Sequence, residues 1–139
     1  MRIVLLGAAL LVGAAQAKWK EIGKTSTGNP VFVEPKSVKK GADGIVTATV
    51  RVTFVKPAAT PKGPITASRT VAMFDCAKQV VAVKENTYYH DEKSNNVYQH
   101  SAPAKPGFGP AIKGTMPDLA MGYLCSATRA ARSAGSARR

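Results

Sequence analysis

The segment Val46-Thr-Ala-Thr-Val-Arg-Val-Thr-Phe54 has the most regular pattern in the chain. Apolar residues occupy every even position, and threonine or arginine occupies the odd positions between them. Successive side chains of a β-strand point to opposite faces of the sheet, so this period of two predicts one buried face and one wet face. Such strands are typical of antiparallel sheets. The segment therefore indicates a mainly β protein.

Shorter segments on both sides of this strand carry weaker β patterns. Clusters of Gly, Pro, Asn and Asp separate them, because these residues favour turns or cannot donate to a sheet ladder. Residues 91–96 predict a hairpin connection, residues 57–64 with three prolines predict a stiff loop, and residues 103–110 are expected to be irregular. The further predicted strands are residues 19–22, 31–33, 65–76, 79–89 and 97–100.

A helical pattern begins at Pro117 and Asp118. Proline suits the first helical turn, and an acidic residue is stabilised by the positive end of the helix dipole. The residues that share one face at helical spacing are Met121, Leu124, Cys125 and Thr128. The predicted helix ends near Thr128, and residues 129–139 are expected to form a basic flexible tail. The fold class is therefore α+β, mainly β.

Residues 1–17 have the composition of a secretory leader. Arg2 precedes an apolar run over residues 3–12, and Ala15-Gln-Ala17 offers small residues where a signal peptidase cleaves. The run is shorter than the roughly 20 apolar residues that span a bilayer, and no later segment is long and apolar enough to span one. We predict cleavage after Ala17 and export of a domain of residues 18–128 with its tail.

Cys76 and Cys125 are the two cysteines of the chain. An exported chain meets an oxidising compartment, where two cysteines allow one intramolecular pairing. A metal site or a reactive thiol is the alternative, but neither cysteine has a nearby Cys or His at ligand spacing. The predicted disulfide would clamp the helix onto the strand that ends at Cys76.

The formal net charge is +12, and the leader contributes only Arg2 to it. Such a charge attracts polyanions and anionic surfaces. Export excludes nucleic acid as the expected partner and leaves sulfated polysaccharide, acidic proteins or anionic lipid head groups. The alternative is that the lysines only keep the protein soluble.

Five features, taken in order, resemble the surface-adhesin protein E family of exported bacterial proteins. Trp19 follows the leader, and residues 31–38 (Val-Phe-Val-Glu-Pro-Lys-Ser-Val) are similar to the family's aromatic, Val, acidic, x, x, Ser, aliphatic pattern. The long alternating strand comes next, then Phe74-Asp-Cys76, then a final cysteine in the helix. The resemblance covers residues 19 to about 126.

The resemblance implies an antiparallel sheet of about six strands, with a C-terminal helix tethered by the disulfide. It further implies binding to extracellular-matrix or serum proteins, at the periplasm or outer cell surface of a Gram-negative-type bacterium, and it leaves a homodimer open. Fold does not dictate function, and relatives share the fold without shown adhesion. The basic tail and the strongly basic surface depart from the family pattern.

Two groups of residues are candidates for a binding surface. His90 and His100 flank the predicted hairpin and, with nearby tyrosines, would form an aromatic, pH-sensitive patch if the strands pair. The alternatives are ordinary strand packing or, more weakly, a haem or metal carrier. Tyrosine is favoured at interfaces. The other group is a loop cluster of lysines that would form part of a polyanion-binding rim. The candidate residues are Tyr88, Tyr89, His90, Tyr98, His100, Lys36, Lys39 and Lys40.

Catalytic motifs do not occur in the sequence. It contains no Gly-x-Ser-x-Gly elbow, His-Glu-x-x-His motif or Gly-rich phosphate loop, and its acidic residues are few and separated. We therefore expect a non-enzymatic exported binding protein without a cofactor, whose partners are extracellular proteins or polyanions. A periplasmic structural or stress protein without such a ligand is the alternative.

Overall fold

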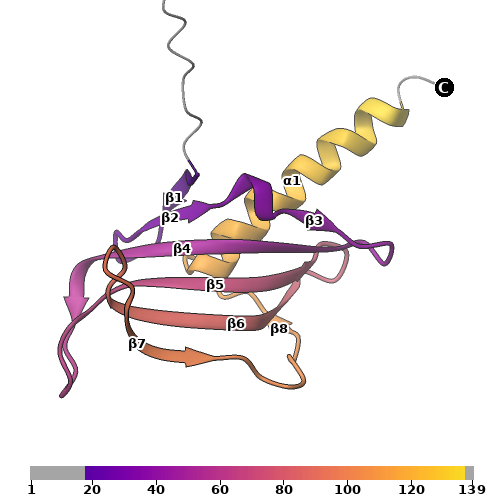
Figure 1. Cartoon of the computed structure of the whole chain (residues 1–139). Coiled ribbons are helices and arrows are strands. Elements are labelled where there is room, and N and C mark those ends of the chain that lie inside the picture. Colours follow the sequence, from indigo (N-terminus) through magenta and orange to yellow (C-terminus); the bar gives the residue numbers. More distant parts are fainter. Residues whose placement is uncertain (1–17, 137–139) are drawn as a thin grey trace, which may run out of the picture.

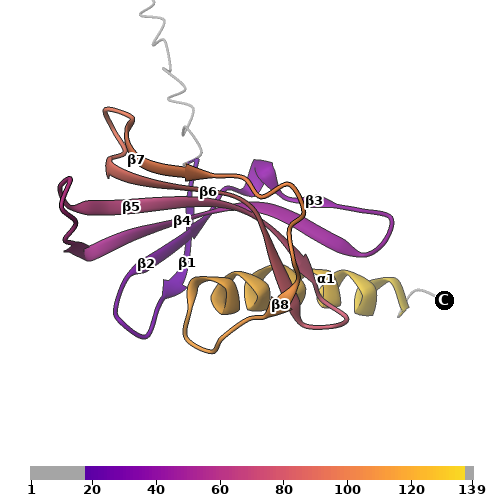
Figure 2. The same ribbon diagram turned by 90° about the horizontal axis from the view of Figure 1, so that it is seen from below.

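The computed structural model describes residues 18–136, with side chains described to Ser126. One antiparallel sheet curls around one side of a long helix, α1 (Figures 1 and 2). In chain order the elements are β1 (Lys20–Lys24), β2 (Pro30–Val33), the 3-10 turn η1 (Pro35–Ser37), β3 (Lys39–Lys40), β4 (Ile45–Ala58), β5 (Ile65–Asp75), β6 (Val80–Asp91), β7 (Asn96–Ser101), β8 (Gly109–Pro110) and α1 (Met116–Ser136).

Six strands form the main path of the sheet, in the order β1-β2-β4-β5-β6-β7. The two-residue strands β3 and β8 pair with β4 and β6. Each pairing is antiparallel, and most neighbours in the sheet are also neighbours in the sequence. The predicted antiparallel sheet of about six strands is confirmed.

The even-numbered residues of β4 form the centre of the core. Val46, Ala48 and Val50 are at most 1% exposed, while the odd positions between them are half-buried. On the neighbouring strand, Phe74 pairs with Val46 and is fully buried. The alternation in the sequence therefore predicted which face of β4 packs against the helix.

Helix α1 covers that buried face. Ala120, Met121 and Leu124 are at most 4% exposed and belong to the same core as the β4 valines. Cys125 bonds to Cys76, with their Cα atoms 5.5 Å apart, so the predicted tether between the end of β5 and the helix is confirmed.

The helix is longer than the sequence indicated. It continues to Ser136, so the predicted end near Thr128 is wrong. Figure 1 shows this last part running past the edge of the sheet. The side chain of Thr128, predicted for the apolar face, lies outside the described side chains. The flexibility expected of residues 129–139 stays a prediction.

Strand β4 also extends beyond its predicted end, through Pro57 to Ala58. The ladder between β4 and β5 breaks after Thr53 and resumes at Ala58, opposite Ile65. Pro57 falls in this gap, where its missing N–H costs no ladder bond.

The predicted leader, residues 1–17, lies outside the described residues. Between residues 18 and 136 there is no helix of sufficient length and apolar character to cross a membrane.

Candidate functional site

The face of the sheet opposite α1 carries the odd-numbered side chains of β4 and β5. Within residues 18–136 no α-helix lies on this face (Figure 2). Its central residues are half-buried and not fully exposed. Two clusters occupy it: a lysine-lined pocket toward β3, and an arginine–aromatic cluster near Trp19.

The pocket begins with an interruption at one edge of the sheet. Strands β2 and β3 both pair with β4, through Val33 opposite Val50 and Lys39 opposite Thr47. Residues 34–38 leave the sheet between these points and form η1. Pro35 begins this turn, as expected for a residue with fixed φ at a first helical position.

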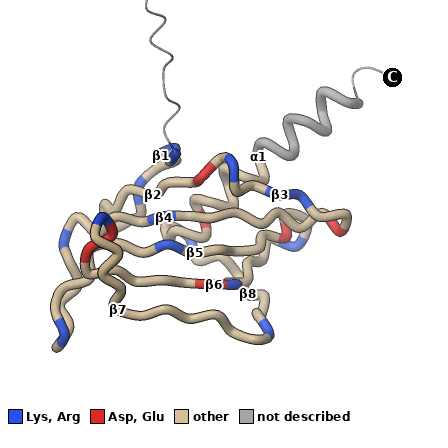
Figure 3. Tube along the Cα trace, in the orientation of Figure 1, with Lys and Arg blue, Asp and Glu red and all other residues tan. Residues whose placement is uncertain are grey.

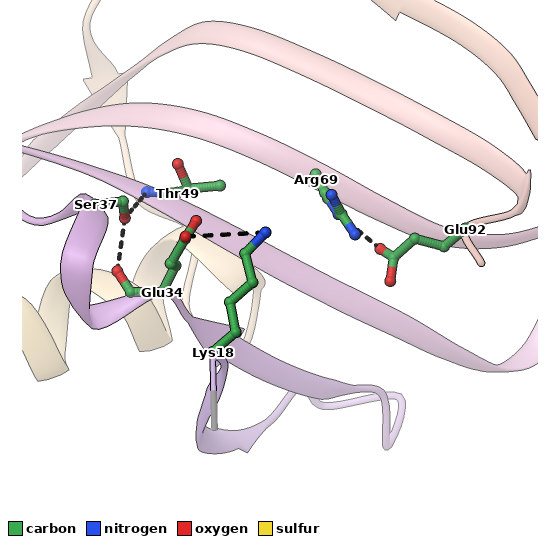
Figure 4. Close-up of polar contacts among 6 residues, drawn as sticks. All are labelled: Lys18, Glu34, Ser37, Thr49, Arg69 and Glu92. Carbon is green, nitrogen blue, oxygen red and sulfur yellow. Dashed lines mark hydrogen bonds and ion pairs between the residues drawn. The ribbon is translucent and has the colours of Figure 1, made fainter. Parts of the chain in front are cut away.

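The Ser37 side chain holds this excursion against β4 (Figure 4). Its hydroxyl donates to the Glu34 carbonyl oxygen at 2.7 Å and accepts from the Thr49 backbone N–H at 2.8 Å. The Glu34 N–H donates to the Thr49 carbonyl oxygen at 3.1 Å. Both backbone groups of Thr49 are therefore bonded, although neither β2 nor β3 pairs with β4 at that position.

The excursion forms one wall of a pocket of about 570 Å³, which we call the lysine pocket. Residues from η1, β3, the β3–β4 turn, β4, β5 and β6 surround it. They are Lys36, Ser37, Lys39, Lys40, Gly41, Asp43, Ile45, Thr47, Thr49, Val71, Met73 and Lys84. A pocket of this size falls in the range of small-ligand sites, roughly 300–1,000 Å³.

Lys84 reaches the lysine pocket from β6 because of a β-bulge. Val71 pairs with Glu85 and Ala72 with Val83, so Lys84 is the extra residue without a partner on β5. A bulge turns a side chain away from regular alternation and is common beside functional sites. Lys36, Lys39 and Lys40, which the sequence analysis expected at a binding rim, are thus joined by Lys84. Lys84 lies 44 positions after Lys40, so spacing in the sequence did not suggest it.

The four lysines of the pocket are exposed, and none has a carboxylate within 4.0 Å among the described residues. Asp43 is the acidic residue of the lining. Its Oδ1 accepts from the Ile45 N–H at 3.0 Å, which fixes the turn. The lysine pocket therefore carries a net positive charge that is not neutralised within the described chain.

The second cluster surrounds Glu92, which comes from the β6–β7 hairpin. Arg69 Nε donates to Glu92 Oε2 at 3.0 Å (Figure 4), and Arg51 Nε lies 2.6 Å from Oε1 at an angle outside hydrogen-bond geometry. Partial burial lowers the pKa of Arg69, but the hydrogen bond and the charge of Glu92 outweigh it and raise that pKa overall. Arg69 is therefore fully charged at neutral pH.

Trp19 lies over both arginines. The Arg51 and Arg69 Cζ atoms are 5.8 and 5.4 Å from the centre of the Trp19 ring, within the range of cation–π attraction. Phe32 also contacts Arg51, and Tyr89 contacts Arg69. This cluster fixes the segment that directly follows the predicted cleavage point, so its role in the fold is structural.

Comparison with known proteins agrees with this architecture. The family model described as surface-adhesin protein E matches residues 19–126. The chain belongs to the surface-adhesin protein E family. Three of the similar solved structures are of Haemophilus influenzae protein E, including crystal form II (14% identity, TM-score 0.55, covering 81% of this chain and 90% of that chain).

The other two solved structures are of the same Haemophilus influenzae protein. The selenomethionine form of H. influenzae protein E is 14% identical, with a TM-score of 0.54, and the match covers 81% of this chain and 88% of that chain. Protein E from non-typeable H. influenzae is 15% identical, with a TM-score of 0.52, and the match covers 82% of this chain and 79% of that chain. At this identity the likeness shows the fold alone. No curated protein sequence matches the chain significantly. Family membership makes this an adhesin-like surface protein.

In this adhesin E domain, the two predicted histidines lie on neighbouring strands but do not meet. His90 packs edge-on against Tyr98, with ring centres 5.3 Å apart, and its Nδ1 lies 2.7 Å from the Pro64 carbonyl oxygen. His100 instead sits opposite Thr87, and its Nε2 lies 3.5 Å from Glu85.

The predicted tyrosines divide between the two faces of the sheet. Tyr88 and Tyr89 are consecutive on β6, in continuous register with Ser68 and Ala67, so their side chains point to opposite faces. Tyr89 is 7% exposed and belongs to the arginine–aromatic cluster. The structure therefore brings together His90 and Tyr98 but no single aromatic patch of all five residues.

The other lysines that the sequence analysis expects in loops do not line the lysine pocket; they are Lys56, Lys62, Lys105 and Lys113. Lys56 lies nine positions along β4 from Thr47, which corresponds to about 30 Å of strand. In Figure 3 basic residues are spread over the trace, with one group along β3. A single rim containing all the loop lysines is not formed.

The candidate metal or haem site gains no support from geometry. Residues 18–126 contain no group of three His, Cys, Asp or Glu side chains placed to hold a metal ion. His90 and His100 each have other partners, described above.

Proposed function

We propose that this protein is an exported, non-enzymatic adhesin-like protein that binds an acidic extracellular protein or a polyanionic polysaccharide through the lysine pocket. The observation that carries this proposal is the convergence of four exposed, unpaired lysines on one pocket. They come from separate parts of the chain, so the fold itself concentrates the charge. Family membership supports an adhesin-like role.

Several lysines are needed because each exposed ion pair is weak, about 0.2–1 kcal/mol. Four ammonium groups around one pocket can act on the same anionic partner at once. Screening by salt weakens interactions of exposed charges strongly above about 0.15 M ionic strength. Binding is therefore expected to depend steeply on salt.

A pull-down with the oxidised mature chain, residues 18–139, tests this function. Extracellular-matrix and serum extracts, and a heparin-like polymer, are offered at low and at high salt. We expect capture of an acidic protein or of the polymer at low salt and its loss at high salt. Failure to capture anything from any of these sources would contradict the proposal.

Surface display is a separate part of the proposal. Protease applied to intact cells should release or degrade a surface-exposed protein and leave a periplasmic control intact. Complete protection would instead support the alternative of a periplasmic envelope protein. The homodimer stays a prediction that the oligomeric state in solution would test.

A further inference from the structure

The lysine pocket has an apolar floor as well as a basic rim. Ile45, Val71 and Met73 are half-buried at its base, while the lysines that surround them are exposed. A site for a simple anion would need only the charged groups. The floor adds a surface of CH groups that a ligand with its own apolar face would cover.

The polar lining supplies hydrogen-bonding groups between the floor and the rim. Thr47 and Thr49 contribute hydroxyl groups, and Asp43 Oδ2 has no hydrogen-bond partner within the described residues. An acceptor carboxylate among four ammonium groups repels a uniformly anionic ligand. It suits a ligand that carries hydroxyl donors beside its anionic groups.

The lining contains no aromatic side chain among the described residues. Nucleobases are held mainly by stacking on aromatic rings, so a nucleotide is a poor match. An extended acidic peptide would use the charges but not the continuous aliphatic floor. A sugar ring has a CH face, hydroxyl groups on its rim, and, in acidic sugars, sulfate or carboxylate substituents.

We propose that the lysine pocket binds an acidic sugar unit of a soluble polysaccharide, with the ring over Val71 and Met73 and its anionic groups toward the lysines. This inference rests on the proposed function and narrows it to one class of ligand. The pocket volume of about 570 Å³ is that of a small-ligand site, so one or two sugar rings are the natural unit.

Titration of the oxidised mature chain, followed by NMR, tests the inference. The probes are a sulfated uronic-acid disaccharide, sodium sulfate at equal charge, and a glutamate peptide of equal charge. We expect the disaccharide to shift the Met73 and Val71 methyl signals in a saturable way. Sulfate and the peptide should shift them at least about fivefold less strongly at the same concentration, because they lack an apolar face.

Matched variants distinguish the contribution of the apolar floor to binding from the contribution of the lysine charges. Lys84→Gln removes one pocket ammonium and should weaken disaccharide binding about two- to fivefold, whereas Lys78→Gln removes an exposed lysine outside the pocket and should leave it unchanged. Met73→Gln keeps the charge and the side-chain length, and it should weaken disaccharide binding although no ammonium group is lost. Circular dichroism confirms that each variant is folded.

The outcomes distinguish this inference from the proposed function. Binding of the heparin-like polymer with no disaccharide shift at Val71 or Met73 would overturn the inference and leave the function standing. Binding of the glutamate peptide as strong as that of the disaccharide would also overturn the inference and leave the proposed function standing. Absence of binding to the polymer, the disaccharide and every extract would overturn both.

Discussion

Ser37 is the residue on which the wall of the lysine pocket depends. Its hydroxyl donates to the Glu34 carbonyl oxygen and accepts from the Thr49 N–H. Thr49 lies 12 positions further along the sequence than Ser37. Ser37→Ala leaves the Thr49 N–H without that acceptor, so we expect a loss of about 1–2 kcal/mol in the free energy of unfolding. Urea denaturation measures the loss.

Ser101→Ala is the matched control, because Ser101 is exposed at the end of β7. It should change the free energy of unfolding by less than about 0.5 kcal/mol. Equal stability of the two variants would show that the Ser37 bridge does not hold η1 in place.

Glu92 forms ion pairs with two arginines at once, and its side chain is only 11% exposed. Glu92→Gln leaves Arg51 and Arg69 adjacent with no carboxylate between them, so we expect a loss of about 2 kcal/mol in stability. Glu85→Gln alters a carboxylate that is 47% exposed and should cost less than about 0.5 kcal/mol. Thermal unfolding of both variants compares them, and a smaller loss for Glu92→Gln would contradict the cluster's stabilising role.

Single-residue roles were the least predictable from sequence. The alternation around Val50 correctly assigned the side chains from Val46 to Thr53 to the two faces of β4, because burial follows the period of a strand directly. Glu92 and Arg69 are 23 positions apart, and only the paired register of β5, β6 and the hairpin brings them together. Ser37 belongs to a recognisable motif, but its partner Thr49 could be identified only from the fold.

The helix and its tether are the elements whose behaviour can be tested separately from the sheet. The Cys76–Cys125 bond closes a separation of 49 positions. Replacing both cysteines with alanine should destabilise the protein by about 2–5 kcal/mol. Hydrogen exchange should show α1 losing protection more than β4 and β5, because the core face of the helix is then its main attachment. Equal loss in helix and sheet would contradict a local tether.

Two glycines give opposite predictions, although at each of them a methyl side chain would project into open space. Gly122 is exposed inside α1, so Gly122→Ala should stabilise the protein by about 0.5–1 kcal/mol through helix propensity. Gly44 has φ +80° in the β3–β4 turn, so Gly44→Ala should cost about 1 kcal/mol. Melting temperatures that move in the same direction would contradict this assignment.

The end of α1 was missed for a physical reason. Residues 129–136 have no apolar period, so the amphipathic pattern that located the start of the helix gave no signal there. Alanine and arginine nevertheless have high helix propensity, which favours a helix even where the sequence has no amphipathic pattern. The bulge at Lys84 was missed because register shifts depend on the neighbouring strand.

Across the whole molecule, the sequence predicted a positive field but not its distribution. The charge of +12 follows from composition, and Lys36, Lys39 and Lys40 are close in the sequence. Only the folded structure shows that these three lysines lie around one pocket with Lys84. The lysines of the β4–β5 hairpin do not line that pocket. Binding should therefore depend on which lysines are present as well as on their number.

The most direct measurement compares two triple variants of equal charge for affinity to a heparin-coated surface at about 0.15 M salt. Lys36→Glu/Lys39→Glu/Lys40→Glu should weaken binding at least ~10-fold, because three pocket contacts become repulsive. Lys56→Glu/Lys62→Glu/Lys105→Glu changes the net charge equally at positions outside the pocket and should weaken it no more than ~2–3-fold. Equal losses in the two variants would mean that the overall field, and not the lysine pocket, binds the polyanion.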